Sequence, residues 1–202
     1  MTSFAQINRI ILPDSNWQEI VAHGKRKLLG DYLPGESRGK RAYGIIAGSQ
    51  NEKLLKVARI LPGKKNIRSE EPYKTYMDRI MAQHAVPSKT PLSDRGWVMD
   101  PLELKECYDI CDRENLIVLG TYHMHIVPWK GDPVRDTPTH LDTVLARNSC
   151  LFQFIISMVD ITNPIIRAFY EGIREKETPI LIQSEYNPKT PELYKEISYE
   201  NC

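Results

Sequence analysis

Two histidines that flank a single residue, His123-Met124-His125, are the feature that most restricts the fold of this 202-residue chain. They directly follow the apolar run from Leu116 to Tyr122, which predicts a buried strand. Side chains alternate between the two faces of a strand, so both imidazoles are expected on one face. Such a pair predicts a divalent-metal site that needs a further ligand, although histidines at strand ends also occur as solvated side chains.

Asp142 is the candidate for that further ligand. It lies in the segment Thr139-His140-Leu141-Asp142, which follows Pro138 and opens a predicted short helix that runs to Ala146. The carboxylate is one turn into this helix and could face the two imidazoles. The same Thr-x-x-Asp spacing is also typical of a helix-start capping pattern, in which Asp142 would serve only its own helix.

The remaining pattern predicts one domain of the mixed α/β class. Four residues, 49–52, separate the predicted strands 42–48 and 53–61. This short gap indicates a hairpin, so the sheet is at least partly antiparallel. Apolar runs predict strands at residues 10–12, 42–48, 53–61, 152–159, 164–169 and 178–183.

Helices are predicted in three further places. Ser15 and Gln18 are spaced as a capping box and precede an amphipathic run. Residues 66–97 combine helical spacing of tyrosine and methionine with later prolines, which indicates an inserted helix and loop. Asp100-Pro101 opens a helix. The side chains expected on its apolar face are Leu102, Leu104, Tyr108 and Cys111.

Composition excludes several classes of protein. The chain has 27 basic and 26 acidic residues and a net charge of +1, which favours neither nucleic acid nor a membrane surface as a partner. It shows no secretory signal and no run of about 20 apolar residues. We therefore expect a soluble cytoplasmic protein. Its four cysteines, at positions 107, 111, 150 and 202, are expected to be reduced and mostly buried.

The succession of strand, H-x-H, polar loop and Thr-x-x-Asp resembles the JAMM (MPN+) metalloprotease family, including its prokaryotic JAB-like isopeptidases. The segments Tyr43 to Gly48, Asp100 to Leu104 and Leu119 to His125 resemble further parts of that family, and about residues 15–170 are covered. The resemblance implies a domain over residues 1–183. Its fold would be a mixed, bent sheet flanked by helices, with an insertion at about 66–97 and a polar tail at 184–202.

The resemblance also implies a chemistry. His123, His125 and Asp142 would bind one zinc ion per chain and leave a fourth position open for water. Thr139 would stand where the family has a serine whose hydroxyl stabilises the oxyanion. The implied reaction is hydrolysis of a peptide or isopeptide bond, with the C-terminal tail of a ubiquitin-like or sulfur-carrier protein as a candidate substrate.

The resemblance also implies a general base that accepts the proton of the attacking water. The family places a glutamate three residues before Gly44, where this chain has Arg41. Glu36 in Pro34-Gly-Glu36 is the candidate base, displaced by an insertion, and its alternative is a solvated loop carboxylate. Glu19 lies within a predicted helix and is a weaker candidate. Arg41 also favours an alternative function, a non-catalytic MPN-type scaffold that binds a partner protein.

Several other residues have ordinary structural interpretations. Asp132 and Asp136, in the unusually long spacer, are read as solvated loop charges rather than as partners of the metal ligands. His140 is read as a helix-surface residue or a substrate contact, and His23 and His84 as structural. The sequence predicts neither the substrate nor the oligomeric state.

Two other families with an H-x-H motif fit less well. The metallo-β-lactamase motif H-x-H-x-D-H requires Asp and His where this chain has Val127 and Pro128. Amidohydrolase barrels usually need more than about 200 residues for eight βα units. Both families are therefore disfavoured.

Overall fold

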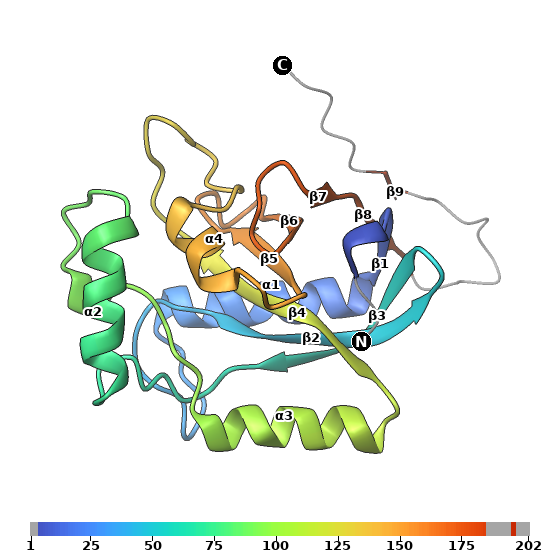
Figure 1. The fold of residues 1–202 in the computed structure, drawn as a ribbon, viewed down its shortest axis with the longest axis horizontal. Helices are drawn as coiled ribbons and strands as arrows, with labels where there is room; N and C mark the ends of the chain where they lie inside the picture. The colour runs from blue at the N-terminus through green and yellow to red at the C-terminus, as the bar shows by residue number, and fades with distance from the viewer. Residues whose placement is uncertain (1–3, 185–194, 197–202) are drawn as a thin grey trace.

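The structure is a computed structural model that describes residues 4–184 and 195–196. These residues form one mixed sheet of nine strands (Figure 1). The strands are β1 (Arg9–Pro13), β2 (Tyr43–Asn51), β3 (Leu54–Pro62), β4 (Ile117–His125), β5 (Phe152–Ser157), β6 (Ile165–Tyr170), β7 (Glu177–Thr178), β8 (Ile180–Gln183) and β9 (Lys195–Glu196). Their order across the sheet is β7-β6-β5-β4-β2-β3-β1-β8-β9. The pairs β1–β3, β1–β8 and β4–β5 are parallel and the others are antiparallel.

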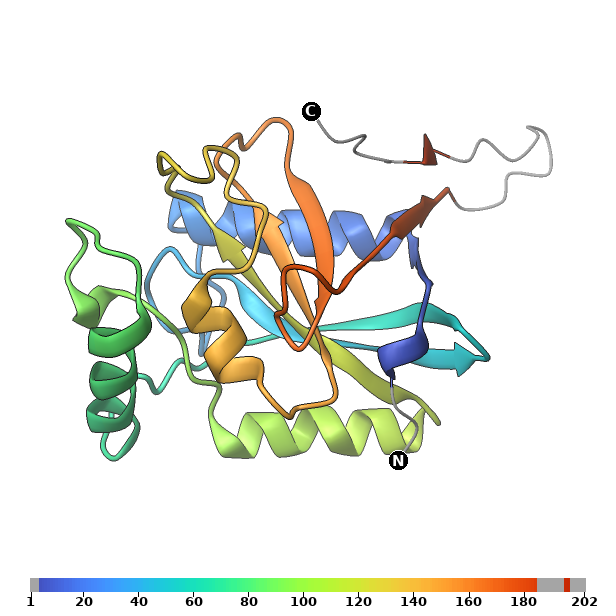
Figure 2. The same cartoon turned by 45° about the horizontal axis from the view of Figure 1, so that its top comes forward.

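Helices cover both faces of this sheet. The four α-helices of the described residues are α1 (Asp14–Leu29), α2 (Tyr73–His84), α3 (Pro101–Arg113) and α4 (His140–Ala146). Figure 2 shows α1 and α3 on opposite sides of the strands, with α2 and α4 beside one end of the sheet. The mixed α/β class and the antiparallel hairpin of β2 and β3 are thus confirmed.

The alternation of side chains along β2 explains why the sheet has a separate hydrophobic core on each face. Ile46 packs in the larger core cluster, together with Trp17 and Ile20 of α1. Its neighbours Ile45 and Ala47 point the other way and pack in a second cluster that includes the cysteines of α3. Successive residues of a strand face opposite sides, so one run of apolar residues supplies both cores.

A glycine allows the sheet to bend at β2. The register between β2 and β3 shifts between Ala47 and Gly48, which marks a bulge. A Cβ atom on Gly48 would lie 2.0 Å from the carbonyl oxygen of Lys56, closer than any side chain permits. Only glycine therefore allows the two backbones to approach here.

Two local expectations were wrong. The box of Ser15 and Gln18 does not form, because α1 begins at Asp14, two residues earlier than a cap at Ser15 requires, and Gln18 instead donates to the Asp14 carboxylate at 3.3 Å. The expected apolar face of α3 is only partly buried. Leu102 and Tyr108 are exposed, whereas Cys111 is buried with Cys107. Asp100 does cap α3, accepting from the Leu102 N–H at 2.8 Å, as its position before a proline predicts.

The segment 66–97, which the sequence resemblance predicts to be an insertion, is organised by one buried arginine. Arg68 is 1% exposed and donates to the carbonyl oxygens of Leu92 and Arg95, each at 2.9 Å. It also forms an ion pair with Asp78 of α2. The guanidinium thereby connects the start of the insertion, its helix and its returning loop, which fixes the segment as one unit.

The ends of the chain add little to the described fold. The predicted polar tail, 184–202, lies outside the described residues except for residue 184 and β9. Cys107, Cys111 and Cys150 are free thiols, the first two buried and the third exposed, and Cys202 lies outside the described residues. Within the described part of the chain, no helix has both the length and the apolar character required to cross a bilayer.

A buried histidine joins α1 to β4. His23 is 2% exposed, and its Nδ1 shares a hydrogen bond of 2.7 Å with the hydroxyl of Tyr122, which is fully buried. Burial, assisted by the charge of Lys27, lowers the pKa of His23 to about 4. The expectation that His23 is structural agrees with these contacts.

This shift predicts a loss of stability in mild acid. An unfolded chain binds a proton at His23 near pH 6.5, whereas the folded protein resists protonation until about pH 4. The contribution is therefore fully present above about pH 6.5 and is lost as the pH falls to 4, and it is on the order of 3 kcal/mol. Urea unfolding of the His23→Gln variant should show a shallower loss over this window. An unchanged pH slope would contradict the assignment.

Candidate metal centre

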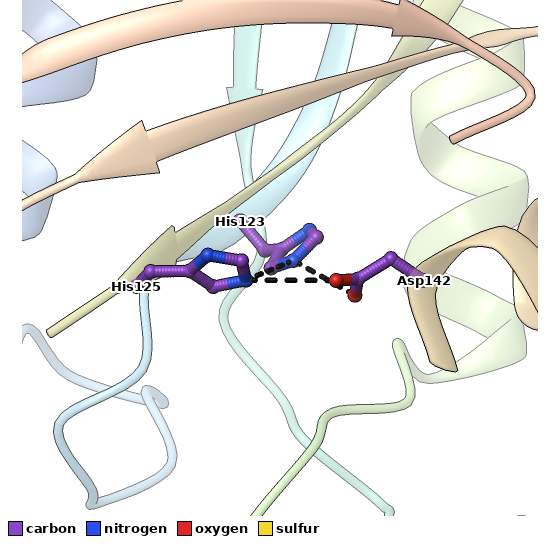
Figure 3. A group of neighbouring side chains, drawn as sticks. All are labelled: His123, His125 and Asp142. Atoms are coloured by element: carbon purple, nitrogen blue, oxygen red, sulfur yellow. Dashed lines mark hydrogen bonds and ion pairs between the residues drawn. The ribbon is translucent and has the colours of Figure 1, made fainter. Parts of the chain in front are cut away.

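The two histidines of the predicted pair lie at the end of β4, a strand in the middle of the sheet. His123 is held between Tyr43 of β2 and Ile155 of β5 by strand pairing. Both imidazoles are buried and their Nε2 atoms lie 3.1 Å apart, with ring centroids separated by 4.9 Å (Figure 3). The expectation that they share one face is confirmed.

Asp142 completes the group from the first turn of α4. Its Oδ1 lies 3.2 Å from Nε2 of His123, and its Oδ2 lies 3.7 Å from Nε2 of His125. Figure 3 shows the carboxylate pointing at both rings. The three side chains are buried, and their ligand atoms all lie within 4.8 Å of one another. The convergence expected from the sequence is therefore present.

Thr139 holds the carboxylate in this position. Its backbone N–H and its hydroxyl donate to Oδ2 of Asp142 at 2.6 and 2.7 Å, and the hydroxyl accepts from the Asp142 N–H at 3.3 Å. The capping box is therefore real, and Asp142 caps α4 while also facing the histidines. The Thr139 hydroxyl donates its proton to Asp142 and so holds this carboxylate, while its role toward an oxyanion stays a prediction.

The tautomer of His125 is fixed by the loop that follows it. Its Nδ1 lies 3.1 Å from the carbonyl oxygen of Arg135, which can only accept, so Nδ1 carries the proton. Burial lowers the pKa of His125 to about 3, so the ring is neutral at pH 7. The Nε2 lone pair therefore faces the carboxylate of Asp142.

A buried carboxylate beside two imidazoles could hold a metal ion. Burial opposes the charge on Asp142, but His123, His125 and the Thr139 N–H hold the pKa of this carboxyl far below its usual range. The site thus presents an ionised carboxylate and a neutral imidazole with its lone pair directed inward. Zinc has tetrahedral coordination with bonds to nitrogen of about 2.0–2.1 Å, which separates two nitrogens by about 3.4 Å. The distance of 3.1 Å between Nε2 of His123 and Nε2 of His125 is close to that spacing.

Asp132 and Asp136 prove to be structural partners of the site, so their interpretation as solvated charges was wrong. Asp132 is 6% exposed and accepts from the Arg135 N–H at 2.6 Å and the Thr137 hydroxyl at 2.7 Å. Asp136 forms an ion pair of 3.0 Å with Arg167 of β6. These contacts fix the loop whose Arg135 carbonyl orients His125. A loop sequence alone carries no signal for such contacts.

Aromatic side chains line another side of the centre. Trp97, at the end of the insertion, stacks on Tyr43 with centroids 4.8 Å apart, and its ring lies 6.2 Å from that of His123. Trp129, in the loop after β4, packs under the guanidinium of Arg135 at 4.6 Å. The role of Trp97 was not predicted, since its distance from His123 in the sequence hides the contact.

Glu36 is not part of this group. Its carboxylate accepts two hydrogen bonds from Arg26, at 2.9 and 3.1 Å, and one from the Leu33 N–H at 3.0 Å. Lys27 lies 3.1 Å away as an ion-pair partner. Burial alone would raise the pKa of Glu36, but these donors lower it to about 2. A carboxylate of such low basicity with so many donors is a poor proton acceptor.

The other candidate positions for a base also differ from the family pattern. Glu19 is exposed on α1. Arg41 is half-buried, and burial lowers the pKa of its guanidinium. Among the described residues, the group that could hold a metal contains no glutamate.

Comparison with known proteins supports the fold alone. No family model matches the chain, and no curated protein sequence matches it. The chain is similar to the solution structure of protein DSY2949 from Desulfitobacterium hafniense, with a TM-score of 0.57 and 19% sequence identity. The similarity covers 89% of this chain and 97% of that chain. At this identity it shows a shared fold, and the resemblance to the JAMM family remains a prediction.

Proposed function

We propose that the protein is a zinc-dependent hydrolase that cleaves a peptide or isopeptide bond. The observation that carries this proposal is the lone pair of His125 Nε2 opposite the ionised Asp142 carboxylate, with His123 beside both. Two imidazoles and one carboxylate are a common set of protein ligands for catalytic zinc. Manganese, iron or cobalt would suit the same donors, so zinc is part of the proposal.

The number of ligands supports catalysis over a purely structural role. Structural zinc sites usually have four protein ligands, whereas catalytic sites leave one position for water or substrate. The group contains three ligands, and within the described residues no further His, Cys, Asp or Glu joins it. Zinc bound there would supply Lewis acidity and lower the pKa of a water molecule toward about 7.

The residues of the chain would prepare the site for that chemistry. Arg135 keeps the proton of His125 on Nδ1, and Thr139 keeps the carboxylate of Asp142 turned toward the rings. Trp97 packs near His123 and helps to exclude solvent from that ring. A rigid set of ligands of this kind lowers the cost of reorganisation during a reaction.

The proposed substrate class rests on the sequence resemblance. It is a protein or peptide, with the C-terminal tail of a ubiquitin-like or sulfur-carrier protein as the candidate. An extended tail presents its backbone amides to a metal site more readily than a folded segment does.

A second candidate function is a metal-binding scaffold without hydrolytic activity. The contacts of Glu36 favour it, because the candidate base is engaged by Arg26 and Lys27. Arg41, where the family has its glutamate, favours it as well. Such a scaffold would keep the metal but lack a group that accepts the proton of the attacking water.

Cleavage assays separate the two functions. Zinc-loaded protein is incubated with a peptide library and with ubiquitin-like proteins that carry C-terminal extensions, and products are identified by mass spectrometry. A hydrolase cleaves at least one class, loses activity in a chelator, regains it with zinc, and is inactive as Asp142→Asn. A wild type that retains its zinc yet leaves every substrate intact would contradict the hydrolase and support the scaffold.

A further inference from the structure

His84 and His140 form a second imidazole pair, on the surface beside the first. His84 is the last residue of α2, and His140 is the first residue of α4. The Nε2 atom of His140 lies 3.1 Å from Nδ1 of His84. The two helices pack together, as both views of the fold show (Figures 1 and 2). The structure therefore joins two histidines that lie far apart in the sequence.

The geometry of this pair matches that of the buried pair. Its ring centroids lie 5.0 Å apart at an interplanar angle of 65°, against 4.9 Å and 65° for His123 and His125. The nitrogen-to-nitrogen distance is 3.1 Å in both pairs. Two imidazole nitrogens bound to one tetrahedral ion would lie about 3.4 Å apart. A small outward movement of the rings is enough to admit an ion at either pair.

We propose that His84 and His140 form a second binding site for a transition-metal cation that clamps the inserted helix to the helix of Asp142. Imidazole nitrogens favour Zn²⁺, Ni²⁺ and Cu²⁺ and are poor ligands for Mg²⁺ and Ca²⁺. The contact is exposed, so water supplies the remaining ligands. In the described residues no carboxylate or thiol completes a group of three here, so this site binds more weakly than the buried one.

The site has a structural consequence for the first metal centre. α2 belongs to the insertion, and α4 carries Asp142 only two residues after His140. An ion at this clamp would fix the insertion against the start of α4. The proposal concerns binding by surface residues and does not depend on the hydrolase activity.

Few histidines compete with His84 and His140 for a metal ion at the surface of the protein. The chain has five histidines, and the other three are all buried. Among the described residues, the hydrogen bond and the ring contact of His84 are both made with His140, so the variant His84→Ala removes a donor of the second site and keeps all three ligand candidates of the first. Gln83→Ala, at the exposed neighbour on α2, is the matched control.

The experiment is calorimetric titration of the metal-free full chain with Zn²⁺. The wild type and Gln83→Ala should bind about two equivalents per chain, one tight and one weaker. His84→Ala should keep the tight equivalent and lose the weaker one, and Asp142→Ala should do the reverse.

A weaker equivalent that persists in His84→Ala would overturn the proposal, as would a wild type that binds no ion other than the one lost in Asp142→Ala. The conservative variant His84→Asn and a Cu²⁺ electron paramagnetic resonance spectrum give the same test if the alanine variant does not fold. Loss of one of two nitrogen-coordinated Cu²⁺ signals is expected, and an unchanged spectrum would contradict it.

Discussion

We expect Asp142→Ala to lack tightly bound zinc, and the wild type to bind about one zinc ion at the buried centre. The carboxylate is the only negative charge in the group, and without it two imidazoles remain on one side of the site. The affinity should fall by more than about 100-fold, which exceeds the effect expected for a residue that only orients a ligand. Zinc content after dialysis against a weak chelator measures this.

A matched variant separates the two roles of Asp142. Thr139→Ala removes the hydroxyl that holds the carboxylate and weakens the cap of α4, at a cost of about 1 kcal/mol. It keeps all three ligands, so the protein should still bind one zinc, about 10-fold more weakly. If Asp142→Ala retains its zinc, or if both variants lose it equally, Asp142 serves its own helix and is not a ligand.

Glu36→Ala should destabilise the folded protein by about 3–5 kcal/mol and leave its zinc content unchanged. The side chains of Glu36 and Lys27 are 1% and 2% exposed and lie 3.1 Å apart. Removal of the carboxylate leaves the buried Lys27 ammonium without its ion-pair partner. Among the described residues, its remaining hydrogen-bond acceptor is the Ser37 carbonyl, at 3.3 Å. Urea unfolding measures the loss, with the exposed Glu106→Ala on α3 as the control.

A double-mutant cycle of Glu36→Ala with Lys27→Met should recover part of the lost stability, because the unpaired Lys27 ammonium is then absent.

A second variant at this position tests whether Glu36 accepts a proton in catalysis. Glu36→Gln should lose stability while any hydrolytic activity per folded molecule is retained. Full stability with abolished activity would show instead that Glu36 acts in the reaction, as the sequence resemblance implied.

Local signals in the sequence were enough for many elements. Asp100 before Pro101 fixes the start of α3, and the short gap between β2 and β3 fixes a hairpin. The convergence of the three side chains was predictable for the same reason, since strand alternation aligns His123 with His125 and the Thr-x-x-Asp spacing positions Asp142.

The expectations that were wrong, or that the structure does not support, depend on contacts between distant segments. Glu36 has the local sequence of a loop carboxylate, but Arg26 and Lys27 of α1 engage it. Asp132 looks solvated until the loop folds over it. Contacts made by backbone groups also limit what the sequence can predict. The carbonyl oxygen of Arg135 fixes the tautomer of His125, but every residue has a carbonyl, so the sequence gives no signal for this contact.

X-ray absorption at the zinc K-edge, on protein loaded with one equivalent of zinc, tests whether His123, His125 and Asp142 bind the ion. We expect a shell of nitrogen and oxygen at about 2.0–2.2 Å with the multiple scattering of two imidazoles and no sulfur. This spectrum should be unchanged in His84→Ala and lost in Asp142→Ala. A sulfur shell at about 2.3 Å, or an identical spectrum after loss of Asp142, would contradict it.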